Sequence, residues 1–258
     1  KYNGKASVVV HGNQPYFTSR EKQNTKSFES YHKLDKLGRC GVAYANVSID
    51  TMPTEKRGEI GQIRPSGWHT VKYSGVVDGN YLYNRCHLIA YCLTAENANK
   101  KNLITGTRYL NNEGMLPYET KTAQYIDKTK NHVLYRVTPV FKGSDLVASG
   151  VLMEAYSVED QGKGISFCVY CYNVQPGVAI DYATGDSHLR RKNNQNSHKS
   201  SAKEHASTVY ILNTNTKKFH KPDCYSVKQM RSKNRKKYKG LRKKLIKDGY
   251  SPCKNCNP

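Results

Sequence analysis

The chain has 258 residues, a hydrophobic fraction of 37% and a formal net charge of +22, from 42 Lys and Arg against 20 Asp and Glu. The length allows one large domain, or one domain with a small module, and the composition is that of a globular protein. No run of about 18 apolar residues occurs, which excludes a helix that spans a membrane. The opening KYNGKASVVV lacks the layout of a signal peptide, and a mature or trimmed chain would look the same, so secretion stays open.

The first part of the chain carries short β-rich patterns that predict strands at residues 6–11, 41–49, 68–73 and 79–84. Between the first two lies SFESYHKLDKLG, which is typical of a short helix stopped by Gly38.

A longer helix is predicted over residues 112–131, where Met115, Ala123 and Ile126 have roughly helical spacing. Three strand-like segments follow, HVLYRVTPVF, LVASGVLMEAYSV and GISFCVYCYNVQ, with Gly-containing turns between them. This order favours an antiparallel sheet with helices against it, which is an α+β fold.

The polar stretch from Gly185 to Ser207 has almost no aliphatic residues and is typical of a flexible linker. We therefore predict a domain over residues 1–186, a linker over 187–207 and a small module over 208–258. In the module, TVYILNTNTKKFH predicts a strand pair and RKKYKGLRKKLIKDG a basic helical stretch.

Positive charge is concentrated at the end of the chain. Residues 190–258 hold 20 basic and 3 acidic residues, a balance of +17, whereas residues 1–189 hold 22 and 17, a balance of +5. Such a surface attracts polyanions through phosphate contacts and counterion release. Solubility alone is the alternative, but solubilising surfaces usually mix both signs.

Four residues of the module have the spacing of metal ligands. His220 and Cys224 form H-x3-C, and after 28 residues Cys253 and Cys256 form C-x2-C. Three thiolates and one imidazole suit a closed tetrahedral Zn²⁺ site. One structural zinc ion would also stabilise a module whose core is too small to fold alone.

The segment from Thr208 to Pro258 resembles the zinc-binding domain of the Ada DNA-repair proteins. In that domain four Cys bind the metal, and one of them accepts a methyl group from DNA. The first of these positions is His220 here. The resemblance therefore implies a zinc-stabilised basic module that binds nucleic acid or protein, without the methyl-acceptor role.

The apolar stretch YLYNRCHLIAY contains a polar pair, Arg85 and His87. In a strand these two side chains point to the same face. A guanidinium can hold a phosphate and a neutral imidazole can take a proton from water, which is half of a phosphodiesterase site. On the residues alone, a structural role for this pair is favoured over a catalytic one, and the Asn-rich loop that follows is typical of turns.

The motifs NRCHLIAY, KNLITGTRYLN, RPSGWHTVKY and NVQPGVAIDYATGD occur in this order, and together they resemble the DNA/RNA non-specific endonuclease family. The likeness spans about Ser7 to Asp186 and is strongest to the DNA-entry and streptococcal secreted branch. It implies a ββα-metal fold with a central antiparallel sheet. The family signature is D-R-G-H, so that Asn84 and Cys86 are departures from it.

The resemblance also implies the roles of individual residues. His87 falls on the general base, and activity is expected to fall as it protonates, near or below its ordinary pKa of about 6.5. Asn111 falls on the residue that ligates one Mg²⁺ ion. Arg85 is the phosphate contact, Asn102 supports the site, and Glu119 holds water beside the metal. The other candidates are Arg108, as a substrate contact, and Glu113, in the outer coordination shell of the metal.

The implied activity is Mg²⁺-dependent hydrolysis of DNA, with RNA as an open second substrate, to 5′-phosphate products by a secreted or cell-surface enzyme. An inactive DNA-binding protein with a zinc module is the alternative, because Asn84 and Cys86 depart from the signature. The sequence identifies no inhibitor partner. It also leaves open a disulfide between Cys40 and Cys86.

Overall fold

A computed structural model describes residues 2–190, 208–222, 224–228, 230–253, 256 and 258. The chain divides into two compact units, Lys1–Arg191 and Lys192–Pro258. Most of the predicted linker, residues 191–207, lies outside the described residues. In the part of the chain that is described, no helix is long and apolar enough to cross a membrane.

The larger unit is built on a six-stranded sheet with the strand order β1-β8-β7-β6-β3-β2, in which every neighbouring pair is antiparallel. From Tyr135 to Val140, buried and partly buried side chains alternate along β6 because successive residues point to opposite faces of the sheet. The strands are β1 (Ser7–Val9), β2 (Phe28–Tyr31), β3 (Ala43–Val47), β6 (Val133–Val140), β7 (Gly150–Ser157) and β8 (Ser166–Tyr172).

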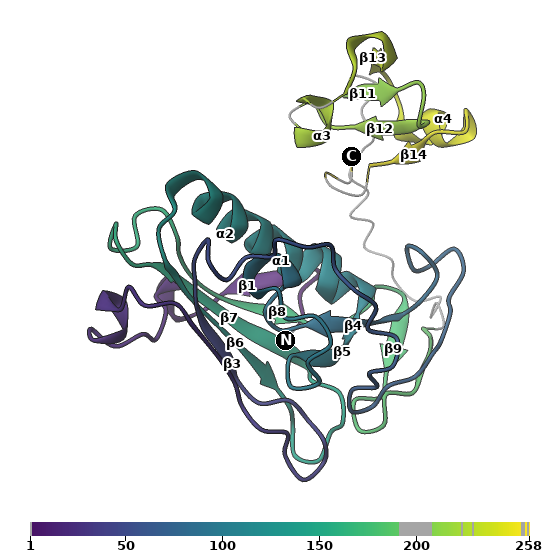
Figure 1. Ribbon diagram of the computed structural model, residues 1–258. Coiled ribbons are helices and arrows are strands. Elements are labelled where there is room, and N and C mark those ends of the chain that lie inside the picture. Colours follow the sequence, from purple (N-terminus) through teal and green to yellow (C-terminus); the bar gives the residue numbers. More distant parts are fainter. Residues whose placement is uncertain (1, 191–207, 223, 229, 254–255, 257) are drawn as a thin grey trace. The chain divides into compact units, whose positions relative to one another are not determined.

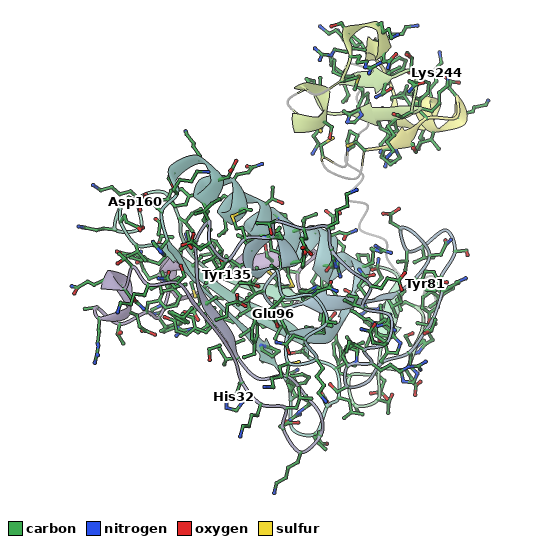
Figure 2. All side chains as sticks on the ribbon, viewed as in Figure 1. His32, Tyr81, Glu96, Tyr135, Asp160 and Lys244 are labelled. Atoms are coloured by element: carbon green, nitrogen blue, oxygen red, sulfur yellow. The ribbon has the colours of Figure 1, made fainter. Side chains whose placement is uncertain are left out.

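Helices α1 (Tyr91–Thr94) and α2 (Leu116–Thr129) lie over one face of this sheet (Figure 1). Helix α2 has Pro117 in its first turn and ends at Lys130, whose left-handed conformation lets its N–H reach the Ile126 carbonyl. Ile126 packs with sheet residues in the main core. Tyr135 of β6 belongs to the same interior (Figure 2).

The opposite face carries a smaller cluster around Phe17, Leu134 and Val158. Leu134 and Tyr135 are consecutive in β6, so they supply the two faces in turn. The segment before β2 holds two short 3₁₀ helices, η1 (His11–Asn13) and η2 (Glu21–Gln23).

A second, two-stranded antiparallel sheet positions the candidate site. It pairs β4 (Tyr83–His87) with β5 (Leu103–Thr107), and a π-helical turn, η3 (Leu110–Met115), then leads directly into α2. Strand, strand and helix therefore form a ββα unit. A further pair, β9 (Val178–Ile180) with β10 (Ser187–Leu189), ends the larger unit.

The smaller unit is a four-stranded sheet with the order β13-β11-β12-β14. Tyr210, Leu212, Phe219 and Leu245 form its core. Its elements are β11 (Val209–Asn213), β12 (Lys218–His220), α3 (Tyr225–Lys228), η4 (Ser232–Asn234), β13 (Arg235–Lys239), α4 (Arg242–Lys247) and β14 (Ser251–Pro252).

The structure confirms the α+β class with a central antiparallel sheet, and also the long helix, the three strands after it and the strand pair of the module. The short helix predicted over residues 27–38 is wrong. Phe28–Tyr31 is instead the edge strand β2, paired with β3, because pairing to the sheet outweighs a weak local helix preference. Gly38 has a left-handed φ of 74° but ends a turn.

Three further predictions need correction. Residues 68–73 contribute only an isolated bridge between Lys72 and Tyr81. The basic stretch 235–249 is helical only in α4, because β13 pairs with β11 up to Lys239. The predicted linker starts too early, since β10 pairs with β9. The sequence left a disulfide between Cys40 and Cys86 open, and in the structure both are free thiols.

Candidate active site and metal centre

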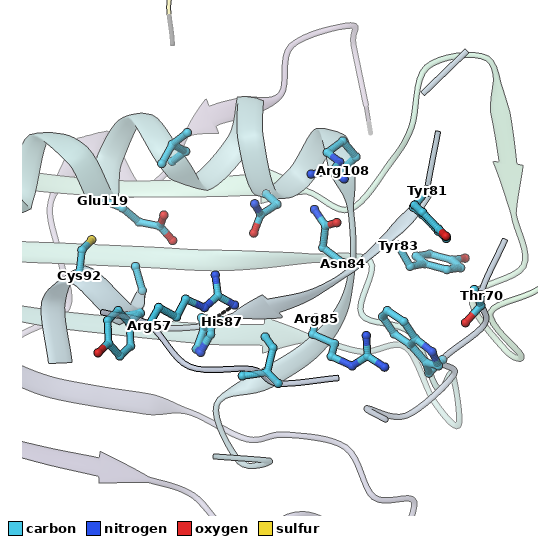
Figure 3. A pocket seen from close by; sticks show the side chains of 16 residues that line it. Arg57, Thr70, Tyr81, Tyr83, Asn84, Arg85, His87, Cys92, Arg108 and Glu119 are labelled. Atoms are coloured by element: carbon cyan, nitrogen blue, oxygen red, sulfur yellow. Dashed lines mark hydrogen bonds between the residues drawn. The ribbon is translucent and has the colours of Figure 1, made fainter. Parts of the chain in front are cut away.

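A cleft of about 780 Å³ opens beside the ββα unit (Figure 3). Side chains from β4, from the π-helical turn, from α2 and from the loop before β4 all face it. The lining comprises Arg57, Ile60, Trp68, Thr70, Tyr81, Tyr83, Asn84, Arg85, His87, Ala90, Tyr91, Cys92, Arg108, Asn111, Leu116 and Glu119. Three arginines and one carboxylate give the cleft a positive balance, which suits a polyanionic ligand.

His87 is the last residue of β4 and is 7% exposed. Its Nε2 lies 2.8 Å from the Asn97 carbonyl oxygen, so Nε2 carries the hydrogen, and the lone pair of Nδ1 faces an Arg57 guanidinium nitrogen. Burial lowers the pKa of His87 to about 4, and the Arg57 charge acts in the same direction. The imidazole is therefore neutral at neutral pH and able to accept a proton at Nδ1.

Arg57 is the residue that sequence reasoning missed. One of its guanidinium nitrogens lies 3.5 Å from His87 Nδ1, and Figure 3 shows it beside the imidazole. It comes from a polar loop, TEKRGEIG, whose sequence has no periodicity or motif that would predict a site. Only the fold brings this loop against β4.

Glu119 projects from the first half of α2 into the same cleft and is 9% exposed. Burial raises the pKa of its carboxyl group to about 8, against a partial lowering by Arg57. Among the described residues, no hydrogen bond to this carboxylate is found. A buried carboxylate without a partner is costly when ionised, and a cation in the cleft would stabilise it.

Asn111 lies in the π-helical turn and lines the cleft. Its Nδ2 donates to Asn112 Oδ1 at 3.0 Å, and its Oδ1, an acceptor with two lone pairs, lies 3.3 Å from Cys86 Sγ. Mg²⁺ takes oxygen ligands and keeps several waters, so one carbonyl oxygen and a nearby carboxylate are suitable. Asn111 and the unpartnered Glu119 therefore fit a hydrated Mg²⁺.

Arg85 lines the cleft but is partly engaged elsewhere. Its guanidinium donates to the backbone carbonyls of Gly61 and Ile63, the former at 2.6 Å, and stacks over the Trp68 ring at 4.2 Å. Arg108 lines the cleft as well, and its Nε is buried without a hydrogen-bond partner. Both arginines are thus placed to meet an anionic ligand.

The structure does not bring two predicted residues into the cleft. Asn102 is fully buried, and its side chain bonds both the N–H and the carbonyl of Ile89 at 2.9 Å. Asn102, which was predicted to support the site, therefore braces the backbone two residues after His87 and does not face the cleft. Glu113 is exposed and does not line the cleft.

The smaller unit contains the four predicted zinc ligands as one cluster. The ligand atoms of His220, Cys224, Cys253 and Cys256 all lie within 4.8 Å of one another. His220 ends β12 and Cys253 follows β14, and the parallel pairing of these strands brings the two halves of the motif together. His220 Nε2 is buried without a partner while Nδ1 lies 3.7 Å from Cys224 Sγ.

A family model described as DNA/RNA non-specific endonuclease matches residues 18–159, which is more than half of the chain. The chain belongs to this family of metal-dependent endonucleases. A deoxyribonuclease of Streptococcus dysgalactiae subsp. equisimilis is 32% identical over 111 residues, 41% of this chain. The match spans only 33% of that relative's length.

Solved structures agree with the family. NucA from Streptococcus agalactiae, crystallised with magnesium ion bound, has a TM-score of 0.64 at 25% identity over 74% of this chain and 89% of its own. Sda1 nuclease with bound zinc ion has a TM-score of 0.60 at 25% identity over 72% of this chain and 96% of its own. The fold is therefore NucA-like.

The buried carboxylate predicts that Glu119→Gln stabilises the Mg²⁺-free protein. Because the pKa of Glu119 rises from an ordinary value near 4.5 to about 8, the folded carboxyl group keeps a proton that the unfolded chain releases. The contribution of the Glu119 carboxyl group to the free energy of unfolding is fully present below pH 4.5 and is lost as the pH rises toward 8. At pH 7 the variant should be more stable by about 3 kcal/mol, measured by urea unfolding followed by fluorescence.

Trp68 is the only tryptophan, so fluorescence excited beyond the tyrosine absorption band reports the larger unit alone. The gain should shrink toward pH 4.5, and added Mg²⁺ should stabilise the unmodified protein more than the variant. If Glu119→Gln were less stable at pH 7 than the unmodified protein, the Glu119 carboxylate would not be buried without a compensating interaction.

Proposed function

We propose that this protein is a Mg²⁺-dependent, sequence-nonspecific endonuclease that cleaves DNA, with RNA as a second substrate to be tested. One observation carries the proposal: a neutral imidazole, an arginine and an unpartnered buried carboxylate share a single cationic cleft. These are the groups that hydrolysis of a phosphodiester requires. The crystallisation of NucA with magnesium supports the choice of cation.

In this mechanism His87 Nδ1 takes a proton from a water molecule that attacks phosphorus. The Asn97 carbonyl holds the imidazole in the required tautomer through Nε2. Arg57 contacts the phosphate oxygens next to His87 and stabilises the charge that develops on them. Its positive charge also keeps the imidazole deprotonated.

Asn111 and Glu119 would hold Mg²⁺, which supplies positive charge beside the phosphate and the leaving 3′ oxygen. Arg85 and Arg108 bind the backbone on either side of the scissile bond, and the product carries a 5′ phosphate. Contacts to phosphate carry no base information, so the enzyme has low sequence preference. The similarity to a solved extracellular endonuclease concerns the fold only. That this protein is itself secreted is part of our proposal.

We further propose that the smaller unit is an Ada-type zinc module that tethers nucleic acid. Three thiolates and an imidazole, mostly buried, suit one closed structural Zn²⁺ site. With His220 in place of the methyl-accepting Cys, the cluster serves stability. Exposed Lys and Arg side chains of β13 and α4, including Lys244, supply the phosphate contacts (Figure 2).

His87→Ala should abolish Mg²⁺-dependent cleavage of plasmid DNA, with a loss of about 10²–10⁴-fold for the missing base. Fragment release is measured on a gel, with DNA and RNA as separate substrates and EDTA as the metal-free control. His32→Ala, which removes an exposed imidazole, should cleave normally. Full activity in His87→Ala would refute the assignment, and an inactive unmodified chain that still binds DNA would favour the non-enzymatic alternative.

The pH profile should have its acidic limb well below the ordinary histidine pKa near 6.5. Burial lowers the pKa of His87 to about 4, so the base stays deprotonated to about pH 5 and is lost as the pH falls through 4. Cleavage rates at saturating Mg²⁺ test this. At limiting Mg²⁺ the fall should begin near pH 8, because protons compete with the cation for Glu119. An acidic limb at pH 6.5 at saturating Mg²⁺ would contradict the lowering of the His87 pKa by burial.

Cys224→Ser should lower the zinc content of the full chain from one ion to a small fraction, measured by atomic absorption. The same variant should bind DNA more weakly at low salt, with a shallower dependence of log K on log salt concentration. Cys168→Ala, which removes a buried thiol of the larger unit, is the matched control and should keep both properties. An unchanged zinc content in Cys224→Ser would contradict the proposal that this cluster binds zinc.

A further inference from the structure

The thiol of Cys86 lies against the side chain proposed to bind the cation. Cys86 is in β4 immediately before His87 and is 1% exposed. Its Sγ lies 3.3 Å from Asn111 Oδ1 and 3.5 Å from Met115 Sδ. Of its neighbouring oxygen acceptors, the His87 carbonyl is farther away, at 3.7 Å. Asn111 Oδ1 is therefore the preferred acceptor for the thiol hydrogen.

The neighbouring strand leaves room for this side chain. A Cβ atom added to Gly106 of β5 would lie 2.5 Å from Cys86 Cβ and 3.2 Å from Cys86 Sγ. Residue 106 can be only glycine while Cys86 keeps this position. The thiol is thus enclosed by β5 on one side and by the π-helical turn on the other, and it has little freedom to turn away from Asn111.

The orientation of Asn111 leaves one side of its oxygen for a cation. Its Nδ2 donates to Asn112 Oδ1, so its Oδ1 faces Cys86. A carbonyl oxygen has two lone pairs, and a thiol hydrogen uses one of them. A cysteine with an ordinary pKa of about 8.5 is protonated at neutral pH. The donor is therefore present.

We propose that Cys86 is a positioning residue: its S–H donates to Asn111 Oδ1 and directs the second lone pair of that oxygen to Mg²⁺ in the cleft. The inference rests on the proposed function, because it takes Asn111 as the ligand. Groups that bond to a metal ligand orient it and preserve metal affinity. A thiol is a weak donor, so the effect is smaller than that of a carboxylate or imidazole partner.

The test is the binding of Mg²⁺ to the full, zinc-loaded chain without substrate, measured by titration calorimetry. Cys86→Ala should weaken binding by about three- to tenfold. Cys86→Ser restores a donor and should bind within about twofold of the unmodified protein, since a hydroxyl donates to the same oxygen. Equal weakening in both variants, or none in Cys86→Ala, would overturn the proposal.

Cys171→Ala is the matched control for lost packing. Cys171 is equally buried, and its Sγ lies 3.4 Å from the Gly114 carbonyl of the same π-helical turn, without contact to Asn111. If this variant weakens binding as much as Cys86→Ala, the effect is general and the proposal fails.

Asn111→Ala separates this inference from the proposed function. If Asn111→Ala leaves Mg²⁺ binding unchanged, the proposed cation site itself is wrong, and the inference falls with it. If Asn111→Ala removes binding but Cys86→Ala has no effect, only the role of Cys86 is wrong. When residual binding is measurable, Cys86→Ala should add no further loss in the Asn111→Ala background, because the two residues act through one contact.

Discussion

The burial of Glu119 is the constraint on which the candidate site depends. Helix α2 carries this carboxyl group into a cleft where, among the described residues, it receives no hydrogen bond. A group in that position stays protonated or finds a cation, and both outcomes follow from the cost of an isolated buried charge. Partial burial also keeps His87 neutral, because desolvation disfavours the imidazolium ion. One physical cause therefore favours a neutral imidazole and a cation in the same place, and it does so at the expense of stability.

The two candidate metal sites of this chain differ in their surroundings. In the larger unit, a six-stranded sheet and α2 bury an extensive core, and the oxygen donors face a cleft. In the smaller unit, the described residues form two buried clusters of four residues each, and the second contains Cys224 and Cys253. Hard oxygen donors suit a hydrated cation such as Mg²⁺, whereas thiolates suit a structural Zn²⁺ ion. In our proposal the first site serves catalysis and the second stabilises the fold of the smaller unit.

Sequence patterns could predict the elements whose periodicity is strong. Helix α2 and strands β6 to β8 follow from apolar spacing, and the zinc cluster follows from the spacing of its ligands. The edge strand β2 could not be predicted, because only pairing with β3 makes that polar segment extended. Arg57 and Asn97 lie in irregular segments without a motif, and only tertiary contacts place them beside His87. The contact of Cys86 with Asn111 was equally hidden, because it joins a strand to a π-helical turn that no spacing rule predicts.

Strand β13 forms the outer edge of the small sheet, and its residues read Arg-Lys-Lys-Tyr-Lys. An uncovered edge strand invites pairing with the same edge of another copy, which is a common start of aggregation. Here every such encounter would bring rows of ammonium and guanidinium groups together at close range. Like-charge repulsion therefore keeps copies of this small sheet apart in concentrated solution, while counter-charged polymers can still approach the same edge.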